Sequence, residues 1–369
     1  MAAQAWRQGW NGSMITNYWS AAQAGTDIRE AAAALAAGGV VAFPTETVYG
    51  LGGDAGNTEA VSKIFAAKGR PSDNPLIVHL ADAASAERLA TRVNDIERLL
   101  MEAFWPGPLT LVLPVREGTV SPLVTAGLDT VAVRVPAHEV ARRLIAESGK
   151  PIAAPSANRS GRPSPTLAEH VREDLDGRID GLLDGGPTGV GLESTVVRVV
   201  DGRVHILRPG GVTREMLSEA LVGRASVADG NGRPDDEQDG DQAREQAPRS
   251  PGVKYAHYAP RGEMLLVTGD PEAMIAAAQA RVDEARGGGR RVGVLACSEH
   301  ADRYEADAIF DCGPRGRPEV AAQTLYARLR ECDERELDFI VAEGYEEHGI
   351  GAALMNRLRK AAGGRVLRV

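Results

Sequence analysis

The segment that decides the fold reads P-T-E-T-V-Y-G-L-G at residues 44–52 and K-G-R-P-S-D-N-P-L-I-V-H at residues 68–79. Residues 39–43, just before it, are apolar and β-prone, which predicts a strand. Pro44 cannot donate a ladder hydrogen bond and therefore ends that strand. The polar residues 45–47 then stand where the chain leaves the sheet, and open α/β sheets bind their ligands at this edge.

A helix is predicted between the two motifs, because apolar residues recur at helical spacing after Asn57, a suitable N-cap. Gly69 indicates that this helix ends near Lys68. Lys68 and Arg70 are then fixed cations at the helix exit, and the strand predicted after them carries His79. Arginine offers a planar fork of donors and lysine a point charge, a pair suited to holding a polyphosphate.

Two interpretations of this pair of cations are open. Cations at a helix C-terminus are favourable against the helix dipole without any ligand, and a single such pair is more often structural. Here residues 45–79 also contain the T-E-T turn, Asn74 and His79, and the α/β pattern would bring them to one sheet edge. This convergence favours a nucleotide or phosphate site.

These segments resemble the signatures of the YrdC-type threonylcarbamoyl-AMP synthases in their long, two-domain, Sua-type form. Five further segments match the same family in order, and the resemblance covers roughly residues 27–220. One such motif would be weak, but seven in sequence are specific. The five further segments are W-P-G-P-L-T-L-V-L at 105–113, T-V-A-V-R-V-P at 130–136, A-P-S-A-N-R-S-G at 154–161, E-S-T-V-V at 193–197 and L-R-P-G at 207–210.

The composition is that of a globular chain of 369 residues, 43% hydrophobic and 25% charged, which is long enough for two domains. Its net charge of -9 argues against a nucleic-acid binder that works by bulk electrostatics. The three cysteines lack metal-ligand spacing and are expected to be ordinary thiols in a reducing compartment. No apolar run suits a signal peptide or a membrane span, so we expect a cytoplasmic protein.

Changes in composition predict an α/β chain in four parts. Residues 1–26 are small and polar, which predicts a flexible N-terminal extension. Residues 27–222 contain short strands separated by helices of different lengths, which predicts a YrdC-like catalytic domain with a twisted mixed sheet flanked by helices. Residues 261–369 alternate strand and helix, which predicts a smaller, parallel, Rossmann-like α/β accessory domain.

The remaining part, residues 223–260, is predicted to be a linker. Up to residue 249 it is rich in Asp, Glu, Gln, Gly and Arg, the composition of a disordered segment. It ends in S-P-G-V-K-Y-A-H-Y-A-P at residues 250–260, and aromatic residues are unexpected in a spacer. Long members of the family carry a similar segment that folds back over the nucleotide site, so the resemblance implies that Tyr255 reaches into that site.

The resemblance implies an enzyme, a nucleotidyltransferase that makes threonylcarbamoyl-AMP and pyrophosphate from L-threonine, bicarbonate and ATP. The product would supply the threonylcarbamoyl group for a tRNA adenosine beside the anticodon. The implied partners are therefore the downstream tRNA threonylcarbamoyl-transferase proteins, while strong direct tRNA binding and a membrane are not expected. Adenylation also needs a divalent ion, for which we expect Mg²⁺ held by phosphate and water instead of by protein ligands.

Residue by residue, the resemblance assigns two groups of side chains. Lys68 and Arg70 would be the catalytic cations on the triphosphate, and Arg134 is the natural bidentate partner of the substrate carboxylate. His79 as a general base is conceivable, although a pocket wall is the favoured role. The threonine pocket would comprise Thr47, His79, Arg134, Ala154 and Ser194. The nucleotide would be held by Lys68, Arg70, Asn74, Thr130, Ser156, Asn158, Ser164, Arg208 and Tyr255.

Two other classes of protein stay open. One is an RNA-binding module, because YrdC-type domains have a concave basic surface, although the net charge of -9 counts against it. The other is a carbamoyltransferase of the hydrogenase-maturation type, which shares the domain. Those proteins carry acylphosphatase and zinc-finger segments, whereas this chain lacks any C-x-x-C. The preference for threonine over serine and the oligomeric state are not set by the sequence.

Overall fold

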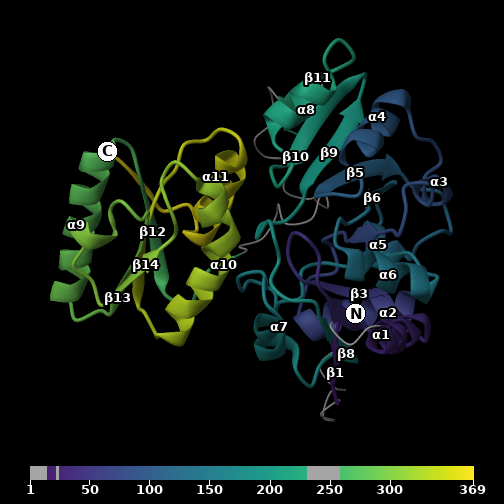
Figure 1. Ribbon diagram of the computed structural model, residues 1–369, viewed down its shortest axis with the longest axis horizontal. Coiled ribbons are helices and arrows are strands. Elements are labelled where there is room, and N and C mark those ends of the chain that lie inside the picture. The colour runs from purple at the N-terminus through teal and green to yellow at the C-terminus, as the bar shows by residue number, and fades with distance from the viewer. Residues whose placement is uncertain (1–14, 22–24, 231–257) are drawn as a thin grey trace, which may run out of the picture.

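The structure is a computed structural model of the chain, and it describes residues 15–21, 25–230 and 258–369. Two separate β-sheets organise these residues: an 11-stranded sheet in the N-terminal part and a five-stranded sheet in the C-terminal part. Figure 1 shows the two sheets side by side, with helices α10 (Pro318–Glu334) and α11 (Ile350–Ala361) on the side of the smaller sheet that faces the larger one.

The larger sheet is mixed, with parallel and antiparallel neighbours along its width. Its strands are β1 (Asn17–Ser20), β2 (Val41–Phe43), β3 (Gly50–Asp54), β4 (Ile77–His79), β5 (Leu109–Pro114), β6 (Thr130–Arg134), β7 (Ile152–Ala153), β8 (Gly181–Asp184), β9 (Thr195–Val200), β10 (Arg203–Arg208) and β11 (Ser226–Asp229). They follow the order β1-β8-β2-β3-β7-β4-β6-β5-β9-β10-β11. This order places the predicted motifs, which are far apart in the sequence, on neighbouring strands.

Helices cover both faces of the larger sheet. Helices α1 and α6 lie on one face, where Leu35 and Leu144 pack with Phe43 of the sheet. The remaining helices cover the other face, over a core that includes Ile64 and Leu100. The bounds are α1 (Thr26–Ala36), α2 (Thr58–Lys68), α3 (Ala86–Leu89), α4 (Asp95–Phe104), α5 (Pro122–Thr125), α6 (Glu139–Ser148), α7 (Ala168–Leu175) and α8 (Arg214–Ala220).

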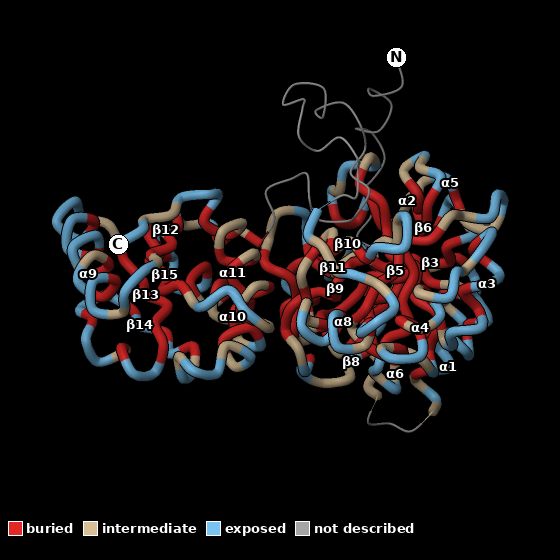
Figure 2. The backbone as a smooth tube through the Cα atoms, turned by 90° about the horizontal axis from the view of Figure 1, so that it is seen from above, coloured by how far each residue is buried: buried red, intermediate tan, exposed pale blue. Residues whose placement is uncertain are grey.

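The smaller sheet is parallel throughout, in the order β14-β13-β15-β12-β16. Its strands are β12 (Glu263–Thr268), β13 (Val292–Ala296), β14 (Ala308–Asp311), β15 (Phe339–Glu343) and β16 (Val366–Arg368). Helix α9 (Pro271–Gly287) covers one face and helices α10 and α11 cover the other, so the strands are buried between them (Figure 2). A short 3-10 helix, Ala301–Arg303, follows β13. Among the described residues, no helix is both long enough and apolar enough to cross a bilayer.

The apolar core beneath α10 and α11 does not stop at the smaller sheet. Val48 and Leu192, which belong to the N-terminal part, are buried in the same cluster as Leu325 and Leu358 of these helices. The predicted architecture, a mixed sheet followed by a smaller parallel one, is confirmed. The boundaries drawn at residues 26, 222 and 260 stay predictions.

The local start and end of α2 follow the sequence closely. The Asn57 side chain accepts hydrogen bonds from the backbone N–H groups of Glu59 and Ala60, at 3.0 and 3.3 Å, and so caps the helix. Gly69 takes the left-handed conformation, with φ 62°, and ends it. Lys68 is therefore the last helical residue, and Arg70 begins the loop that leads to β4.

Two strands lie in segments that composition predicts to be irregular. Residues 17–20 of the predicted extension form β1, which pairs in parallel with β8, and residues 226–229 of the predicted linker form β11, which pairs with β10. The prediction is wrong for these residues. Both are short, half-exposed edge strands without an apolar run, so they lack the pattern by which a strand is recognised.

A third strand, β3, was not expected because its sequence G-L-G-G-D is poor in β-formers. The structure explains the glycines. A Cβ on Gly52 would lie 2.6 Å from a methyl carbon of Ile152 and 2.7 Å from the Phe43 ring, so no larger residue fits between the neighbouring strands. The turn at residues 45–49 thus connects two antiparallel strands, β2 and β3.

Candidate active site

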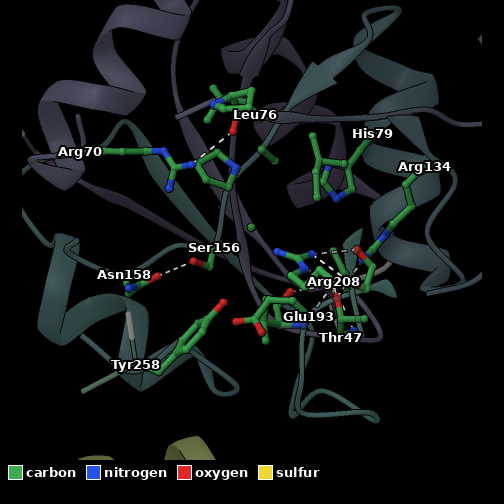
Figure 3. Close-up of a pocket in the computed structure, with 18 of the residues that line it drawn as sticks. Thr47, Arg70, Leu76, His79, Arg134, Ser156, Asn158, Glu193, Arg208 and Tyr258 are labelled. Atoms are coloured by element: carbon green, nitrogen blue, oxygen red, sulfur yellow. Dashed lines mark hydrogen bonds between the residues drawn. The ribbon is translucent and has the colours of Figure 1, made fainter. Parts of the chain in front are cut away.

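One cavity at the edge of the larger sheet collects most of the residues that the motifs predict (Figure 3). Nine of them line it: Thr47, Arg70, His79, Arg134, Ala154, Ser156, Asn158, Ser194 and Arg208. Lys68, Asn74, Thr130 and Ser164 do not line it, and Tyr255 lies outside the described residues. The predicted convergence of Arg70, Ser156 and Arg208 on one cavity is therefore present.

The cavity has two ends. In Figure 3, Arg70, Asn158 and Tyr258 lie on one side and His79 and Arg134 on the other. After the ligands that the resemblance assigns to these residues, we call these the nucleotide end and the amino-acid end. Arg208 and Glu193 lie between them.

Strand pairing builds the amino-acid end. His79 on β4 and Arg134 on β6 are register partners in parallel strands, so both side chains stand at the same level of the sheet. Arg134 is 3% exposed; it donates from Nη1 to the Thr47 hydroxyl at 3.0 Å and from Nη2 to a Glu46 carboxylate oxygen at 3.2 Å. Burial lowers the pKa of Arg134, whereas the Glu46 charge raises it. The result is a fixed guanidinium with an acidic neighbour.

Thr47 is itself held in place by the turn that carries it. Its hydroxyl lies 2.8 Å from that of Thr45, and the Thr45 hydroxyl donates to the carbonyl of Val48 at 2.6 Å. All of these side chains are buried. The T-E-T turn therefore presents Thr47 and Glu46 to Arg134 in one defined arrangement.

His79 is a neutral wall of this end. Burial and the neighbouring Arg134 charge lower its pKa to about 3, so the ring carries no charge near neutral pH. Its ring meets that of Phe43 edge-on at 6.1 Å. An imidazole with so low a pKa is a weak proton acceptor, which favours the pocket-wall role over the general base.

At the nucleotide end, the loop after β7 is held from behind by Lys68. The Lys68 ammonium donates to the backbone carbonyls of Ser156 and Asn158, and it is 3% exposed. Burial, followed by the nearby Arg70 charge, lowers its pKa well below the usual value. Lys68 therefore supports the loop that faces the cavity instead of facing the cavity itself.

That loop arranges its own polar groups. The Ser156 hydroxyl donates to the side-chain oxygen of Asn158 at 2.5 Å. The Asn158 amide donates to the carbonyls of Arg159 and Arg162, at 2.9 and 2.8 Å. Ser156 also pairs as an isolated bridge with Gly50, the first residue of β3. Ser156 and Asn158 thus reach the cavity from a loop that is tied both to Lys68 and to the sheet.

Arg70 lies across from this loop. Its Nη2 donates to the carbonyls of Asn74 and Pro75, at 3.4 and 3.2 Å. Asn74 is fully buried, and neither its amide nitrogen nor its side-chain oxygen has a partner among the described residues. Because Asn74 does not line the cavity, its contribution to the site is the backbone carbonyl that accepts from Arg70.

Between the two ends, the E-S-T motif and the R-P-G motif meet. Arg208 donates from Nε and Nη2 to the backbone carbonyl of Ser194, at 3.1 and 3.0 Å, and from Nη2 to its hydroxyl at 3.2 Å. The Ser194 hydroxyl lies 2.8 Å from that of Thr110 on β5. This explains why a hydroxyl and an arginine from separate motifs belong to one site.

Four polar side chains of the lining are not among the predicted site residues: Thr45, Arg162, Glu193 and Tyr258. Thr45 and Glu193 lie inside motifs that were recognised, so only their individual roles were overlooked. Tyr258 belongs to the same Y-A-H-Y sequence as the predicted Tyr255, and composition gives no ground for choosing between two tyrosines three residues apart. Burial raises the pKa of Tyr258.

Glu193 is the acidic residue of the cavity lining. It accepts a hydrogen bond from the Ser164 hydroxyl at 2.6 Å and one from Nε of Arg357 at 2.7 Å. Burial would raise its pKa, but Arg357, Arg208 and these hydrogen bonds outweigh it and lower the pKa to about 2. Glu193 is therefore ionised, and its partners include a residue of the C-terminal part.

The arrangement can bind an anion but supplies no covalent nucleophile of its own. Four arginines and several hydroxyls line the space, whereas the three cysteines are buried elsewhere. Burial raises the pKa of Cys297 and Cys312 to about 12, so these thiols are not activated. Cys297 also lies near His300 and Glu343 in the one group of the described chain with metal-ligand spacing, where the Glu343 carboxylate already bonds His300 and Tyr304.

Comparison with known proteins bears on both parts of the chain. The family described as "Telomere recombination" matches residues 33–210, and "Threonylcarbamoyl-AMP synthase, C-terminal domain" matches residues 212–363. The threonylcarbamoyl-AMP synthase of Bacillus subtilis is 53% identical over 341 residues, which are 92% of this chain and 94% of that protein. A shorter one from Idiomarina loihiensis is 38% identical over 183 residues, 48% of this chain and 96% of its own length.

A solved structure agrees with these matches. The crystal structure of Pyrococcus abyssi Sua5 complexed with L-threonine is 42% identical in sequence, with a TM-score of 0.84. The match covers 96% of this chain and 100% of that one, so it includes both sheets.

Proposed function

Because this chain belongs to the threonylcarbamoyl-AMP synthase family, in the long form with a C-terminal domain, we propose that the cavity described above is where it makes threonylcarbamoyl-AMP. The enzyme uses ATP as substrate and transfers its adenylyl group. The other classes left open by the sequence, an RNA-binding module and a hydrogenase-maturation carbamoyltransferase, are not favoured, because synthases match over most of the chain.

The observation that carries the proposal is the meeting of Arg70, Arg134 and Arg208 in one cavity with Ser156 and Ser194. These residues come from separate motifs along the chain. Guanidinium groups at both ends suit a substrate pair in which one molecule carries a carboxylate and the other a triphosphate.

At the amino-acid end, Arg134 binds the carboxylate of L-threonine. Its position is set by Thr47 and Glu46, so the amino acid meets a guanidinium that needs no rearrangement. His79, Ala154 and Ser194 form the surrounding wall. The relative whose structure contains L-threonine supports this choice of substrate.

At the nucleotide end, Arg70 and Arg208 hold the triphosphate. Ser156 and Asn158 offer hydroxyl and amide groups from the loop, and Tyr258 closes the space beside them. Asn74, Thr130 and Ser164 do not line the cavity and act by shaping this end. Lys68 acts in the same way, through the two carbonyls that it holds.

The reaction then needs positioning more than covalent chemistry by the protein. The threonine amine attacks the carbon of bicarbonate to form a carbamate, with loss of hydroxide, which leaves as water once it takes up the proton that the amine releases. A carbamate oxygen next attacks the α-phosphorus of ATP in line, and pyrophosphate departs with the bonding electrons. Arg70 and Arg208 stabilise the charge that develops on the leaving group.

Mg²⁺ is proposed to enter with the nucleotide. Glu193 is the carboxylate among the described lining residues, and both of its oxygens already accept hydrogen bonds. The donor set of the cavity therefore fits an ion carried by phosphate oxygens and water, which is the usual way in which Mg²⁺ binds with ATP. When bound, the ion would neutralise phosphate charge.

The product has a defined use. A mixed anhydride of a carbamate and AMP is an activated acyl donor, and we propose that downstream tRNA threonylcarbamoyl-transferase proteins pass its threonylcarbamoyl group to the tRNA adenosine beside the anticodon. We propose that the enzyme works in the cytoplasm, where ATP and tRNA are available. With a net charge of -9, strong direct binding of tRNA is not expected.

The direct test is pyrophosphate release, measured with ATP, bicarbonate and L-threonine present and with each omitted in turn. Full release only with all three present is expected. Release that does not depend on threonine or bicarbonate would count against this function.

A further inference from the structure

Two helices of the C-terminal part, α10 and α11, contact residues at the nucleotide end of the cavity. Arg357 and Arg330 are among the largest fully buried side chains of the described chain, 0% and 1% exposed. Each belongs to a helix of the smaller sheet and bonds a residue of the larger sheet's domain. Burying a charged side chain costs desolvation free energy, so it needs well-placed partners. Those partners show which groups each arginine positions.

The first contact is made on Glu193. Arg357 of α11 donates from Nε to the Glu193 carboxylate at 2.7 Å, and Tyr326 of α10 donates to both carboxylate oxygens, at 3.1 and 2.9 Å. Ser164 occupies the other side of the same carboxylate, at 2.6 Å. Glu193 thus links Arg357 and Tyr326 of the C-terminal part to the Ser164 hydroxyl of the N-terminal part.

The second contact is made one residue before Ser164. Arg330 of α10 donates from Nη2 to the carbonyl of Pro163 and to a carboxylate oxygen of Asp174, both at 2.7 Å. Asp174 also binds Arg162, which lines the cavity. The segment 162–164 is therefore fixed at its side chains and at its backbone by groups that α10 and α11 position.

The third contact is made by packing. The Tyr258 ring lies 5.3 Å from that of Tyr326, and the Arg357 guanidinium lies 5.5 Å from the centre of the Tyr258 ring. Helix α10 also passes so close to Gly191 that a Cβ there would lie 2.4 Å from the Cα of Gln323. The loop before Glu193 follows the surface of the helix.

At the amino-acid end, Val48 packs in the apolar core with α10 and α11, but the polar partners of the site residues lie elsewhere. The partners of Arg134 are Thr47 and Glu46, and His79 packs on Phe43, all of them within the N-terminal part. The described hydrogen bonds and ion pairs that α10 and α11 make to the cavity walls thus concern one end of it.

From these contacts we propose that Arg357 and Tyr326 are positioning residues for ATP, which act through Glu193 on Ser164 and directly on Tyr258. The inference rests on the proposed function, because it takes the end lined by Arg70 and Tyr258 to be the nucleotide end. It predicts that the C-terminal helices set the affinity for ATP and leave the affinity for threonine to the larger sheet.

The test compares Arg357→Met with Arg359→Met. Arg359 is two residues away on α11 and forms an ion pair with Glu347 whose side chains are 35% and 54% exposed, so it controls for the loss of charge on the same helix. Dissociation constants for ATP and for L-threonine are measured by titration calorimetry, and Tm by scanning calorimetry. Arg357→Met is expected to weaken ATP binding at least tenfold and threonine binding less than twofold, whereas Arg359→Met changes neither.

Two further variants separate positioning from simple destabilisation. Arg357→Met leaves the Glu193 charge buried without its main partner, which lowers Tm. Glu193→Gln combined with Arg357→Met removes that charge, so it is expected to regain Tm without regaining ATP affinity. Tyr326→Phe, which keeps the ring and removes only the hydroxyl, is expected to weaken ATP binding about threefold at an almost unchanged Tm, in line with one lost hydrogen bond.

The results distinguish the inference from the proposed function. If the double variant recovers ATP affinity together with Tm, or if Tyr326→Phe and Arg357→Met bind ATP as the wild-type enzyme does, the inference is wrong. If the wild-type enzyme binds ATP and threonine but releases no pyrophosphate, the proposed reaction is wrong, and the positioning of ATP is still judged by the dissociation constants.

Discussion

The amino-acid end and the nucleotide end of the cavity draw their side chains from different kinds of structure. At the amino-acid end, strand register places His79 beside Arg134, and the adjacent turn supplies Thr47 and Glu46. At the nucleotide end, loops supply Arg70, Ser156 and Asn158, and Tyr258 comes from the end of the predicted linker. One end is built by a sheet, and the other is assembled from segments that need external support.

The difference shows what the second domain contributes. The support for the nucleotide end comes from α10 and α11, through Glu193, Pro163 and Asp174. The Idiomarina synthase matches 48% of this chain with 96% of its own length, so it is too short to contain both regions.

The largest expected effect lies at the nucleotide end. Arg70→Ala removes the guanidinium that we propose stabilises the charge developing on the phosphates. Loss of one such group typically costs about 10²–10³ in rate. Pyrophosphate release should fall by that factor in kcat/KM for ATP, with the KM for threonine almost unchanged.

Arg88→Ala is a suitable control for Arg70→Ala, because Arg88 lies on α3 outside the cavity lining. Equal losses of pyrophosphate release in the two variants would mean that the effect of Arg70→Ala does not depend on its place in the cavity.

A comparable but smaller effect is expected at the other end. Arg134→Ala removes the proposed partner of the threonine carboxylate and leaves Glu46 without its ion pair. The KM for threonine should rise by about 10², since truncating one partner of a buried charge pair costs about 2–5 kcal/mol. Arg134→Lys keeps the charge but not the fork and should recover only part of the affinity. A rise in the KM for ATP of the same size would contradict the assignment.

A change beneath both ends should affect them alike. Gly52→Ala places a methyl group 2.6 Å from Ile152 and 2.7 Å from Phe43, in a packed sheet without room for it. Overpacking of this kind costs about 1–3 kcal/mol of unfolding free energy. Denaturant unfolding measures it, and the dissociation constants for ATP and threonine should shift together.

The effects of pH on stability are small within any one pH unit. The pKa of His79 falls from 6.5 to about 3 and that of Glu193 from 4.5 to about 2 in the folded protein. In both cases the unfolded chain binds the proton first as pH falls, so stability is lost on acidification. For His79 the window runs from 6.5 down to about 3, and for Glu193 from 4.5 down to about 2.

Each group contributes at most about 1.4 kcal/mol per pH unit within its window. Denaturant midpoints at several pH values should show a shallower acid slope for His79→Gln between pH 6.5 and about 3. Glu193→Gln should flatten the slope only below pH 4.5. A His79→Gln slope equal to that of the wild type would mean that the ring is not held neutral.

The sequence predicts the amino-acid end better than the nucleotide end, because strands follow local sequence patterns and the contacts of loops do not. The motifs at residues 44–52 and 130–136 carry their geometry in local patterns, a proline-ended strand and an alternating strand, and the structure brings their predicted residues together. Lys68 was assigned to the triphosphate, yet it bonds two loop carbonyls, because a buried ammonium takes the nearest acceptors. The local sequence pattern does not show which acceptors the Lys68 ammonium bonds.

The residues missed at the nucleotide end depend on contacts between distant segments. Glu193 gains its importance from Arg357 and Tyr326, more than a hundred residues later in the chain. Tyr258 is identified by its packing against Tyr326 and Arg357, whereas the predicted Tyr255 lies outside the described residues and stays a prediction. The glycine-rich strand β3 is not predicted, because Gly52 is required by its close contact with Phe43 and Ile152 on neighbouring strands, which the local sequence does not show.

The most direct test of the two-ended cavity is equilibrium binding without turnover. Titration calorimetry of Arg70→Ala and Arg134→Ala with ATP alone and with L-threonine alone gives four dissociation constants. We predict that Arg134→Ala loses threonine binding about a hundredfold and keeps ATP binding, while Arg70→Ala shows the reverse. Equal weakening of both ligands by either variant would show that the cavity does not have separate ends.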